Sequence, residues 1–216
     1  MEKHHLLISG TGRAGTTFLV QLFTQLGLQT GFKNSQDGIH TECNAGMEWP
    51  VEDIFKKSAP YVMKSPGISE HIERILTTPG VVIDCMIIPI RDLYASAESR
   101  RANARRAGNP KTAGGLWMTK KPRRQEAALA IQLHYLVHAL IKHDVPVIWL
   151  HFPRLVEDAE YLHDKLKPVL PGIDLESFSQ AFKIVSRPEL VHVFKQREAP
   201  KGSWFSRLIA AARPSH

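Results

Sequence analysis

The stretch that most limits what this chain can fold into is a glycine-rich turn between a predicted strand and a predicted helix. Residues 5–9 are few and mostly apolar, as in a buried strand of a parallel sheet. Glycines follow at positions 10, 12 and 15. Apolar residues then recur at helical spacing: Phe18, Leu19, Leu22, Phe23 and Leu26. The order strand, turn, helix predicts the first unit of an α/β domain.

The composition of this turn indicates that it binds a phosphate-like anion. Glycines let backbone N–H groups approach an oxyanion, with the helix N-terminus behind them, and the hydroxyls of Thr16 and Thr17 add donors. The spacing from Gly10 to Gly15 matches the start of the motif G-x-x-x-x-G-K, but Thr16 stands in place of the lysine. The obvious cation is Arg13, so we expect an anion cradle not built for phosphoryl transfer. The alternative is a glycine-rich turn without a ligand.

The run GTGRAGTT at residues 10–17, followed by an apolar helix, resembles the 5′-phosphosulfate loop of a known family of sulfotransferases. These enzymes use 3′-phosphoadenosine 5′-phosphosulfate (PAPS), and their fold is related to that of the P-loop nucleotide kinases. Many bacterial members have an arginine in this loop, as here. The resemblance implies that the 5′-phosphosulfate is held by the loop residues Gly12, Arg13, Ala14, Gly15, Thr16 and Thr17.

A second part of the resemblance lies further along the chain. Residues 81–90 form the most apolar run and predict a central strand, which Arg91 follows directly. The family holds the 3′-phosphate of PAPS with an arginine at a strand end and a serine eight positions later, here Arg91 and Ser99. A guanidinium fork and a hydroxyl suit that anion. Asp84 lies too early in the strand to be a metal ligand, because ligands bind at the carboxyl ends of parallel strands.

The catalytic base is expected in the irregular segment 29–50, because related sulfotransferases often place a catalytic glutamate after the first helix. Glu48 is the first choice, since Trp49 and Pro50 could hold it in a fixed, partly dry setting. Glu42 and His40 remain open as alternatives. Each of the three could instead be a solvated loop residue.

Residues 61–65 predict a short strand that ends in Lys64, Ser65 and Pro66. This resembles a Lys-Ser/Thr-Pro segment that lies near the transferring sulfuryl group in bacterial sulfotransferases. The resemblance implies that Lys64, together with Arg13, stabilises charge on the leaving phosphate and on the sulfuryl oxygens. The alternative is a surface lysine at a strand end.

Positive charge is concentrated in the middle of the chain. The sequence has 28 Lys and Arg against 21 Asp and Glu, a net charge of +7, which suits an anionic ligand but also nucleic acid or a membrane surface. An arginine cluster at 100–106 is either a solvated basic face or a contact for the 3′-phosphate or an acidic acceptor. Residues 104–124 predict a basic loop or lid, in which Trp117 could stack on adenine or cover the acceptor. The tail 196–216 predicts a flexible or amphipathic segment for a membrane surface or a neighbouring subunit of a homodimer.

Other features argue against metal and membrane chemistry. Cys43 and Cys85 form no metal or disulfide pattern, which favours a reduced, cytoplasmic setting. His134 and His138 share a face of a predicted helix at 125–143, but no third ligand is in view. The apolar face of that helix is expected to comprise Ala128, Ile131, Leu133, Tyr135, Leu136, Leu140 and Ile141. No signal peptide or membrane-spanning run is expected.

The sequence therefore predicts a single domain over 1–216, with a three-layer α/β/α fold and a mainly parallel, P-loop-like sheet. The expected activity is PAPS-dependent sulfuryl transfer to an acceptor hydroxyl or amine without a metal. The expected acceptor is a small molecule, a sugar or a lipid, and nucleic acid is not expected as a partner. Two alternatives remain: a divergent P-loop nucleotide kinase or NTPase, and a basic nucleic-acid-binding module without catalysis.

Overall fold

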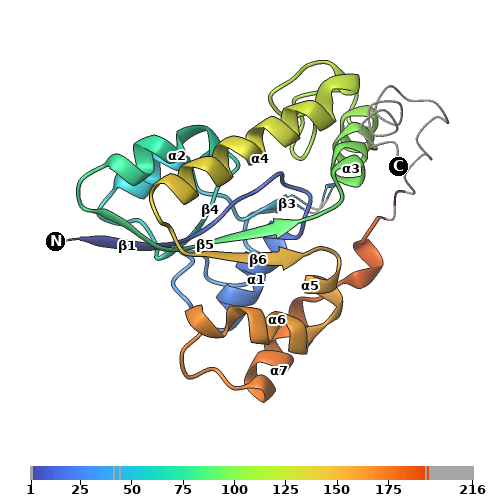
Figure 1. Cartoon of the computed structure of the whole chain (residues 1–216). Coiled ribbons are helices and arrows are strands. Elements are labelled where there is room, and N and C mark those ends of the chain that lie inside the picture. Colours follow the sequence, from blue (N-terminus) through green and yellow to red (C-terminus); the bar gives the residue numbers. More distant parts are fainter. Residues whose placement is uncertain (1, 41, 44, 193, 195–216) are drawn as a thin grey trace, which may run out of the picture.

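The computed structural model describes residues 2–40, 42–43, 45–192 and 194. Its centre is a parallel sheet of four strands, which confirms the predicted fold class (Figure 1). The strands lie in the order β4 (Val62–Lys64), β1 (Lys3–Ile8), β5 (Val81–Ile90) and β6 (Val147–His151). Parallel neighbours cannot be joined by tight hairpins, so every connection between them is a crossover that contains helices.

The sheet has an apolar core on each face, because successive side chains of a strand point to opposite sides. On β1, Leu6 and Ile8 face one cluster and Leu7 faces the other. On β5, Ile87 joins the first cluster and Ile88 the second. All five side chains are fully buried, as expected for a sheet that is covered on both faces.

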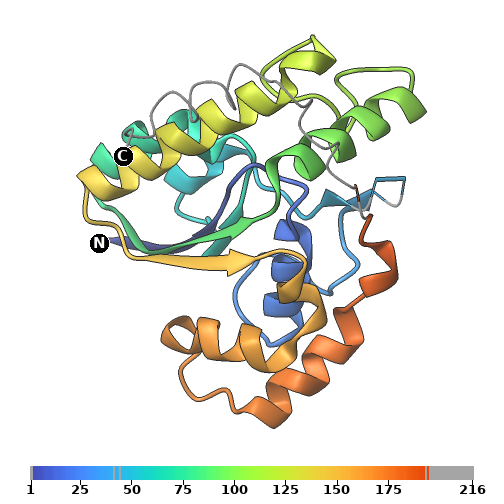
Figure 2. The same cartoon turned by 45° about the vertical axis from the view of Figure 1, so that its right-hand side comes forward.

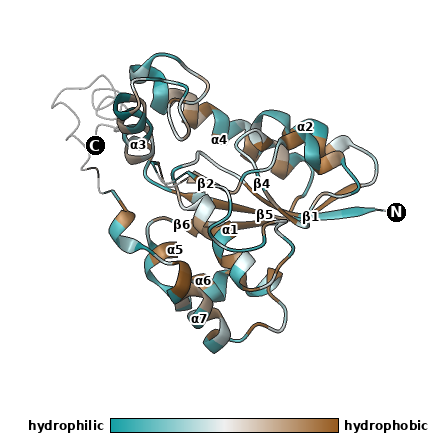
Figure 3. Ribbon diagram, turned by 180° about the vertical axis from the view of Figure 1, so that it is seen from behind, coloured by the Kyte–Doolittle hydropathy of each residue, from teal (hydrophilic) through white to brown (hydrophobic). Residues whose placement is uncertain are grey.

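Helices form the two outer layers (Figures 1 and 3). The first face is covered by α1 (Thr16–Gln25), α5 (Arg154–Glu157), α6 (Ala159–Leu166) and α7 (Leu175–Val185). The second face is covered by α2 (Ile68–Thr77) and α4 (Gln125–Lys142), with α3 (Leu93–Arg106) packed beside α4. None of the helices in the described part of the chain is both long and apolar enough to span a membrane.

Short elements complete the fold. The segment predicted to be irregular contains a small antiparallel pair, β2 (Ile39–His40) with β3 (Ala45–Gly46). Four 3₁₀ turns lie between the larger elements: η1 (Val51–Phe55), η2 (Pro122–Arg124), η3 (Lys167–Val169) and η4 (Pro188–Leu190).

The predicted loop 104–124 is shorter than expected, because α3 continues through Arg106. Arg105 and Arg106 occupy the last turn of that helix, where positive charge is favourable beside the exposed carbonyls. The loop proper covers 107–121 and packs against the protein. Leu116 is buried, and the backbone of Trp117 exchanges two hydrogen bonds with the Gln125 side chain, at 2.8 and 3.1 Å.

The apolar face predicted for α4 was partly wrong. Ile131, Tyr135 and Ile141 are more than half exposed, whereas Leu136 and Leu140 are buried as expected. The buried side of α4 faces the sheet, α2 and α3, and no element in the described part of the chain covers its outer side (Figure 1). The apolar residues therefore extend further around α4 than the face that is buried.

We predict that Leu19→Ala lowers the free energy of unfolding by about 2–5 kcal/mol, because Leu19 is fully buried in the first core and its removal leaves a cavity. Ile141→Ala is the matched control, since Ile141 is 72% exposed, and it should change stability by no more than about 0.5 kcal/mol. Urea unfolding followed by circular dichroism measures both. Similar losses in the two variants would contradict this assignment of the core.

Candidate functional site

The glycine-rich loop lies at the carboxyl edge of the sheet, between β1 and α1. Its backbone takes positive φ at Gly10 (134°), Gly12 (67°), Arg13 (59°) and Gly15 (86°), and Gly15 caps α1. Positive φ at several positions of a turn allows successive N–H groups to point toward one concave side, as in an anion nest. Arg13 is the unusual member, because a residue with a side chain pays about 1–2 kcal/mol in this region.

The side chain of Arg13 offsets that strain by joining three parts of the chain. Its Nε donates to Ser99 Oγ on α3 at 3.1 Å, and its Nη1 donates to the carbonyl of Cys43 at 2.6 Å. Ser99 therefore lies beside the loop, as the expected pairing requires. Ser96 is fully buried and its hydroxyl has no hydrogen-bond partner among the described residues.

Arg91 follows β5 and bonds to the loop as well. Its Nη1 donates to the Arg13 carbonyl at 2.9 Å, and its Nη2 donates to the carbonyl of His192. Its guanidinium also lies 4.8 Å from the centre of the Phe152 ring. Burial, and then the charge of Arg13, lowers the pKa of Arg91 to about 10, so the folded protein disfavours this cation. An anion bound here would relieve that cost.

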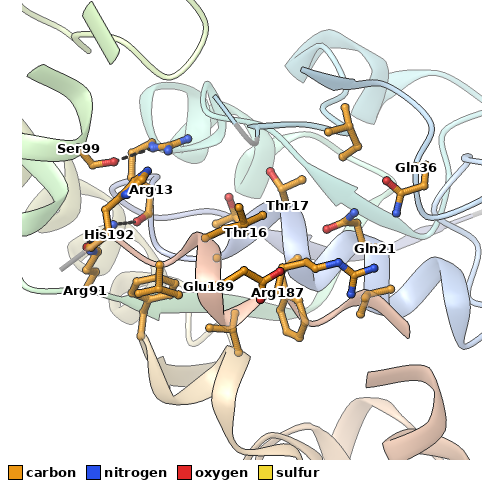
Figure 4. A pocket seen from close by; sticks show the side chains of 18 residues that line it. Arg13, Thr16, Thr17, Gln21, Gln36, Arg91, Ser99, Arg187, Glu189 and His192 are labelled. Carbon is orange, nitrogen blue, oxygen red and sulfur yellow. Dashed lines mark hydrogen bonds between the residues drawn. The ribbon is translucent and has the colours of Figure 1, made fainter. Parts of the chain in front are cut away.

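These residues line a cavity of about 530 Å³, which is large enough for a nucleotide. Figure 4 shows Arg13, Arg91 and Ser99 gathered at one end, with Thr16 and Thr17 in the middle and the glutamines at the other end. The opposite wall comes from the residue that follows β6, from α5 and α7, and from the segment after α7. Its residues are Phe152, Val156, Val185, Arg187, Glu189, Leu190, Val191 and His192.

Lys64 and Glu48 lie next to this cavity rather than in its wall. Lys64 is only 5% exposed, so it is not a surface lysine. Its Nζ donates to Thr17 Oγ1 at 2.8 Å and to the Gly46 carbonyl at 2.6 Å, and it pairs with Glu48 Oε1 at 3.1 Å. Burial lowers the pKa of Lys64, and the Glu48 carboxylate opposes that change. Thr17, which does line the cavity, links the pair to it.

The candidate bases differ in their surroundings. The Glu48 side chain is 39% exposed, which is wetter than the partly dry setting expected from its neighbours. Trp49 nevertheless fixes the backbone there, because its N–H donates to the Lys64 carbonyl at 2.9 Å. His40 and Glu42 are exposed, and the Glu42 carbonyl accepts from Arg106 at 2.8 Å. Of the three, Glu48 is joined to the loop through Lys64 and Thr17.

Arg100 is buried beside the glycine-rich loop and stabilises it through hydrogen bonds. Its buried guanidinium donates to the carbonyls of Thr11 and Gly115, both at 2.9 Å, and burial lowers its pKa to about 10. It passes so close to Gly12 that an added Cβ would lie 2.3 Å from Nη2. Trp117 lies against this group, with its ring centre 5.9 Å from the guanidinium carbon. Trp117 does not line the cavity, and its place beside Arg100 fits the alternative that it packs within the protein.

Several cavity residues escaped the sequence analysis. Gln21 and Gln36 carry no motif, and Arg187, Glu189 and His192 come from the segment that follows α7. That segment returns to the loop only because α7 packs against α1, a contact between elements far apart in sequence. Neither the charge pattern nor the residue spacing of the sequence predicts that this segment lines the cavity.

Metal ligation finds no support within the described ranges, where no group of three His, Cys, Asp or Glu side chains is arranged to hold an ion. The rings of His134 and His138 are tilted by 32° relative to each other, with centres 6.3 Å apart. The predicted amphipathic tail at 196–216 lies outside the described residues. No protein-family model, curated protein or solved structure matches this chain.

We predict that Gly12→Ala destabilises the protein more than Gly108→Ala. Both glycines have φ near +60°, so both variants pay a backbone strain of about 1 kcal/mol. Gly108 has open space around it, whereas the methyl group at position 12 meets Arg100, which is buried and bound to two carbonyls. Urea unfolding of the two variants measures the difference. Equal losses would mean that Arg100 moves aside freely.

Proposed function

We propose that this protein is a sulfotransferase that takes its sulfuryl group from PAPS. The observation that carries the proposal is the convergence of two anion-binding arrangements on one cavity. One is the glycine-rich turn, of which Arg13, Gly15, Thr16 and Thr17 line the cavity, and the other is the Arg91 and Ser99 pair. PAPS carries anionic groups at both its 5′ and 3′ positions, and a cavity lined by two adjacent sets of anion-binding groups suits such a donor.

The 3′-phosphate is assigned to the end of the cavity where Arg91 and Ser99 lie. Arg91 has five N–H donors, and the carbonyls of Arg13 and His192 engage two of its nitrogens. Ser99 accepts a hydrogen bond from Arg13, which leaves its own O–H to donate to a phosphate oxygen. The 5′-phosphosulfate is assigned to the backbone N–H groups of residues 12–17 and the hydroxyls of Thr16 and Thr17.

The transfer itself needs a base and positive charge. In the proposed reaction the acceptor oxygen bonds to sulfur while the bond from sulfur to the 5′-phosphate oxygen breaks, and Glu48 takes the acceptor proton. Lys64 is assigned a positioning role, because its ammonium already donates to Thr17, Gly46 and Glu48. It fixes the carboxylate and adds positive charge behind Thr17, while Arg13 stabilises the leaving phosphate. A sulfuryl group carries less charge than a phosphoryl group, so this chemistry has no need of magnesium.

We predict that the protein binds adenosine 3′,5′-bisphosphate at least tenfold more tightly than ADP, both without magnesium. Arg91→Ala should weaken bisphosphate binding by about 10- to 100-fold, because a buried hydrogen bond to a charged group is worth roughly 1.5–3 kcal/mol. Arg154→Ala is the control, since Arg154 is exposed, pairs with Asp158 and does not line the cavity. Calorimetric titration measures all three proteins. Equal, weak binding of both nucleotides by the wild type would remove the sulfotransferase proposal and favour a general phosphate site.

We also predict that Glu48→Gln lowers the transfer rate by about 10²- to 10⁴-fold, the usual contribution of a general base. The variant should keep its affinity for the bisphosphate within about twofold, because Glu48 does not line the cavity. Transfer of labelled sulfate from PAPS to a mixture of phenol, alcohol and amine acceptors provides the rate. Glu42→Gln and His40→Gln serve as controls. A comparable loss in either control, with Glu48→Gln active, would assign the base elsewhere.

A further inference from the structure

The densest positive charge of this protein lies in one stretch of the chain. Residues 99–125 hold nine of the 28 Lys and Arg and none of the 21 Asp and Glu. The rest of the chain therefore has 19 basic against 21 acidic residues, which is slightly negative. A net charge of +7 that is confined in this way is a local feature of the surface, and a local field attracts a particular partner.

Two of the nine cations are buried inside the protein. Arg100 is bound to the loop carbonyls, and Arg101 is buried against Glu98 and Glu126, at 2.7 Å from each. The other seven are exposed and form what we call the cationic surface: Arg105, Arg106, Lys111, Lys120, Lys121, Arg123 and Arg124. Among the described residues, Arg105 is the one member with an ion pair, a loose contact of 3.5 Å to Glu98.

Three of these cations lie where positive charge does not stabilise the fold. Lys121, Arg123 and Arg124 lie at the start of α4, where the helix dipole is already positive. Positive charge at that end costs roughly 0.3–1 kcal/mol for each group. A charge pattern that opposes local stability is expected where the charges bind a ligand.

The cationic surface borders the candidate site. The loop 107–121 is held beside the glycine-rich turn by hydrogen bonds. Arg100 donates to the Gly115 carbonyl, and Asn103 donates to the Gly114 carbonyl at 3.3 Å. Arg106 donates to the Glu42 carbonyl, one residue before the Cys43 carbonyl that accepts from Arg13. Figure 2 shows α3, this loop and the start of α4 together at one end of the molecule, above the segment that carries β2 and β3.

If the protein transfers sulfuryl groups as proposed above, we infer that its acceptor is an acidic polysaccharide. Seven cations that extend over a helix end, a loop and a second helix start exceed what a small acceptor could contact. A polymer of carboxylated sugars matches them with repeated negative charges and offers hydroxyls as acceptors. The chain would lie along the cationic surface while one hydroxyl reaches the region of Glu48.

Two other polyanionic partners fit less well. A surface that docks on a membrane combines basic residues with several large apolar side chains, and in the stretch 99–125 Met118 is the one large hydrophobic that is strongly exposed. Single-stranded nucleic acid is bound with open aromatic side chains on which bases stack. The one aromatic residue of this stretch, Trp117, lies against Arg100 instead.

The test compares two triple variants that remove the same charge. Lys111→Gln, Lys120→Gln and Lys121→Gln alter the cationic surface, and Lys57→Gln, Lys165→Gln and Lys183→Gln alter exposed lysines elsewhere. The ligand is polygalacturonate, with neutral dextran as its control. Wild-type protein should bind polygalacturonate but not dextran, with an affinity that falls at least about tenfold between 50 and 200 mM salt. The first triple should lose about tenfold or more in affinity, and the second should stay within about twofold.

Equal losses in the two triples would overturn the inference, and so would binding to dextran. Tighter binding to phosphatidylglycerol vesicles or to single-stranded or duplex DNA than to polygalacturonate would assign the surface to a membrane or to nucleic acid. Titration of the same proteins with adenosine 3′,5′-bisphosphate separates this inference from the proposed function. Both triples should bind the bisphosphate as the wild type does. A wild type that binds the polymer but not the bisphosphate would remove the proposed function and leave only an anion-binding surface.

Discussion

Three guanidinium groups packed around one turn are the constraint on which the rest of this structure depends. Arg91 and Arg100 both donate to carbonyls of the loop, and Arg13 extends from the loop to Ser99 and Cys43. Burial lowers the pKa of all three, and Arg13 lowers it further in the other two. Among the described residues, the hydrogen bonds of these guanidinium groups go to backbone carbonyls and a hydroxyl, and the charges of Asp92 and Glu48 offset only part of the burial at Arg91 and Arg100. This concentration of positive charge around the turn is the feature on which the proposed binding of an anion rests.

The local parts of this arrangement were predictable because they depend on short-range pattern. The apolar runs before Gly10 and before Arg91 place both positions at the carboxyl edge of a parallel sheet, where ligands bind. The eight-residue spacing places Ser99 on the second turn of α3, which returns it to the loop. The helical period of α4 likewise gave its bounds to within about one residue.

What the sequence could not provide depends on how layers pack. The role of Arg100 as a buried support and the exposure of Tyr135 both follow from which neighbour covers a helix face. The far wall of the cavity follows from the path of the chain after α7, which no local motif encodes. The segment 107–121 contains the turn residues of a free loop, yet hydrogen bonds to Arg100 and Gln125 fix it against the core. These features depend on contacts between residues far apart in the sequence, so local charge and periodicity do not predict them.

The central claim is that one cavity holds the two ends of a bisphosphorylated adenine nucleotide. A crystal structure of the protein with adenosine 3′,5′-bisphosphate tests this most directly. The account predicts the 5′-phosphate among the N–H groups of residues 12–17, and the 3′-phosphate within hydrogen-bond distance of Arg91 and Ser99. A nucleotide whose 3′-phosphate points into solvent, or one bound outside the cavity, would contradict it.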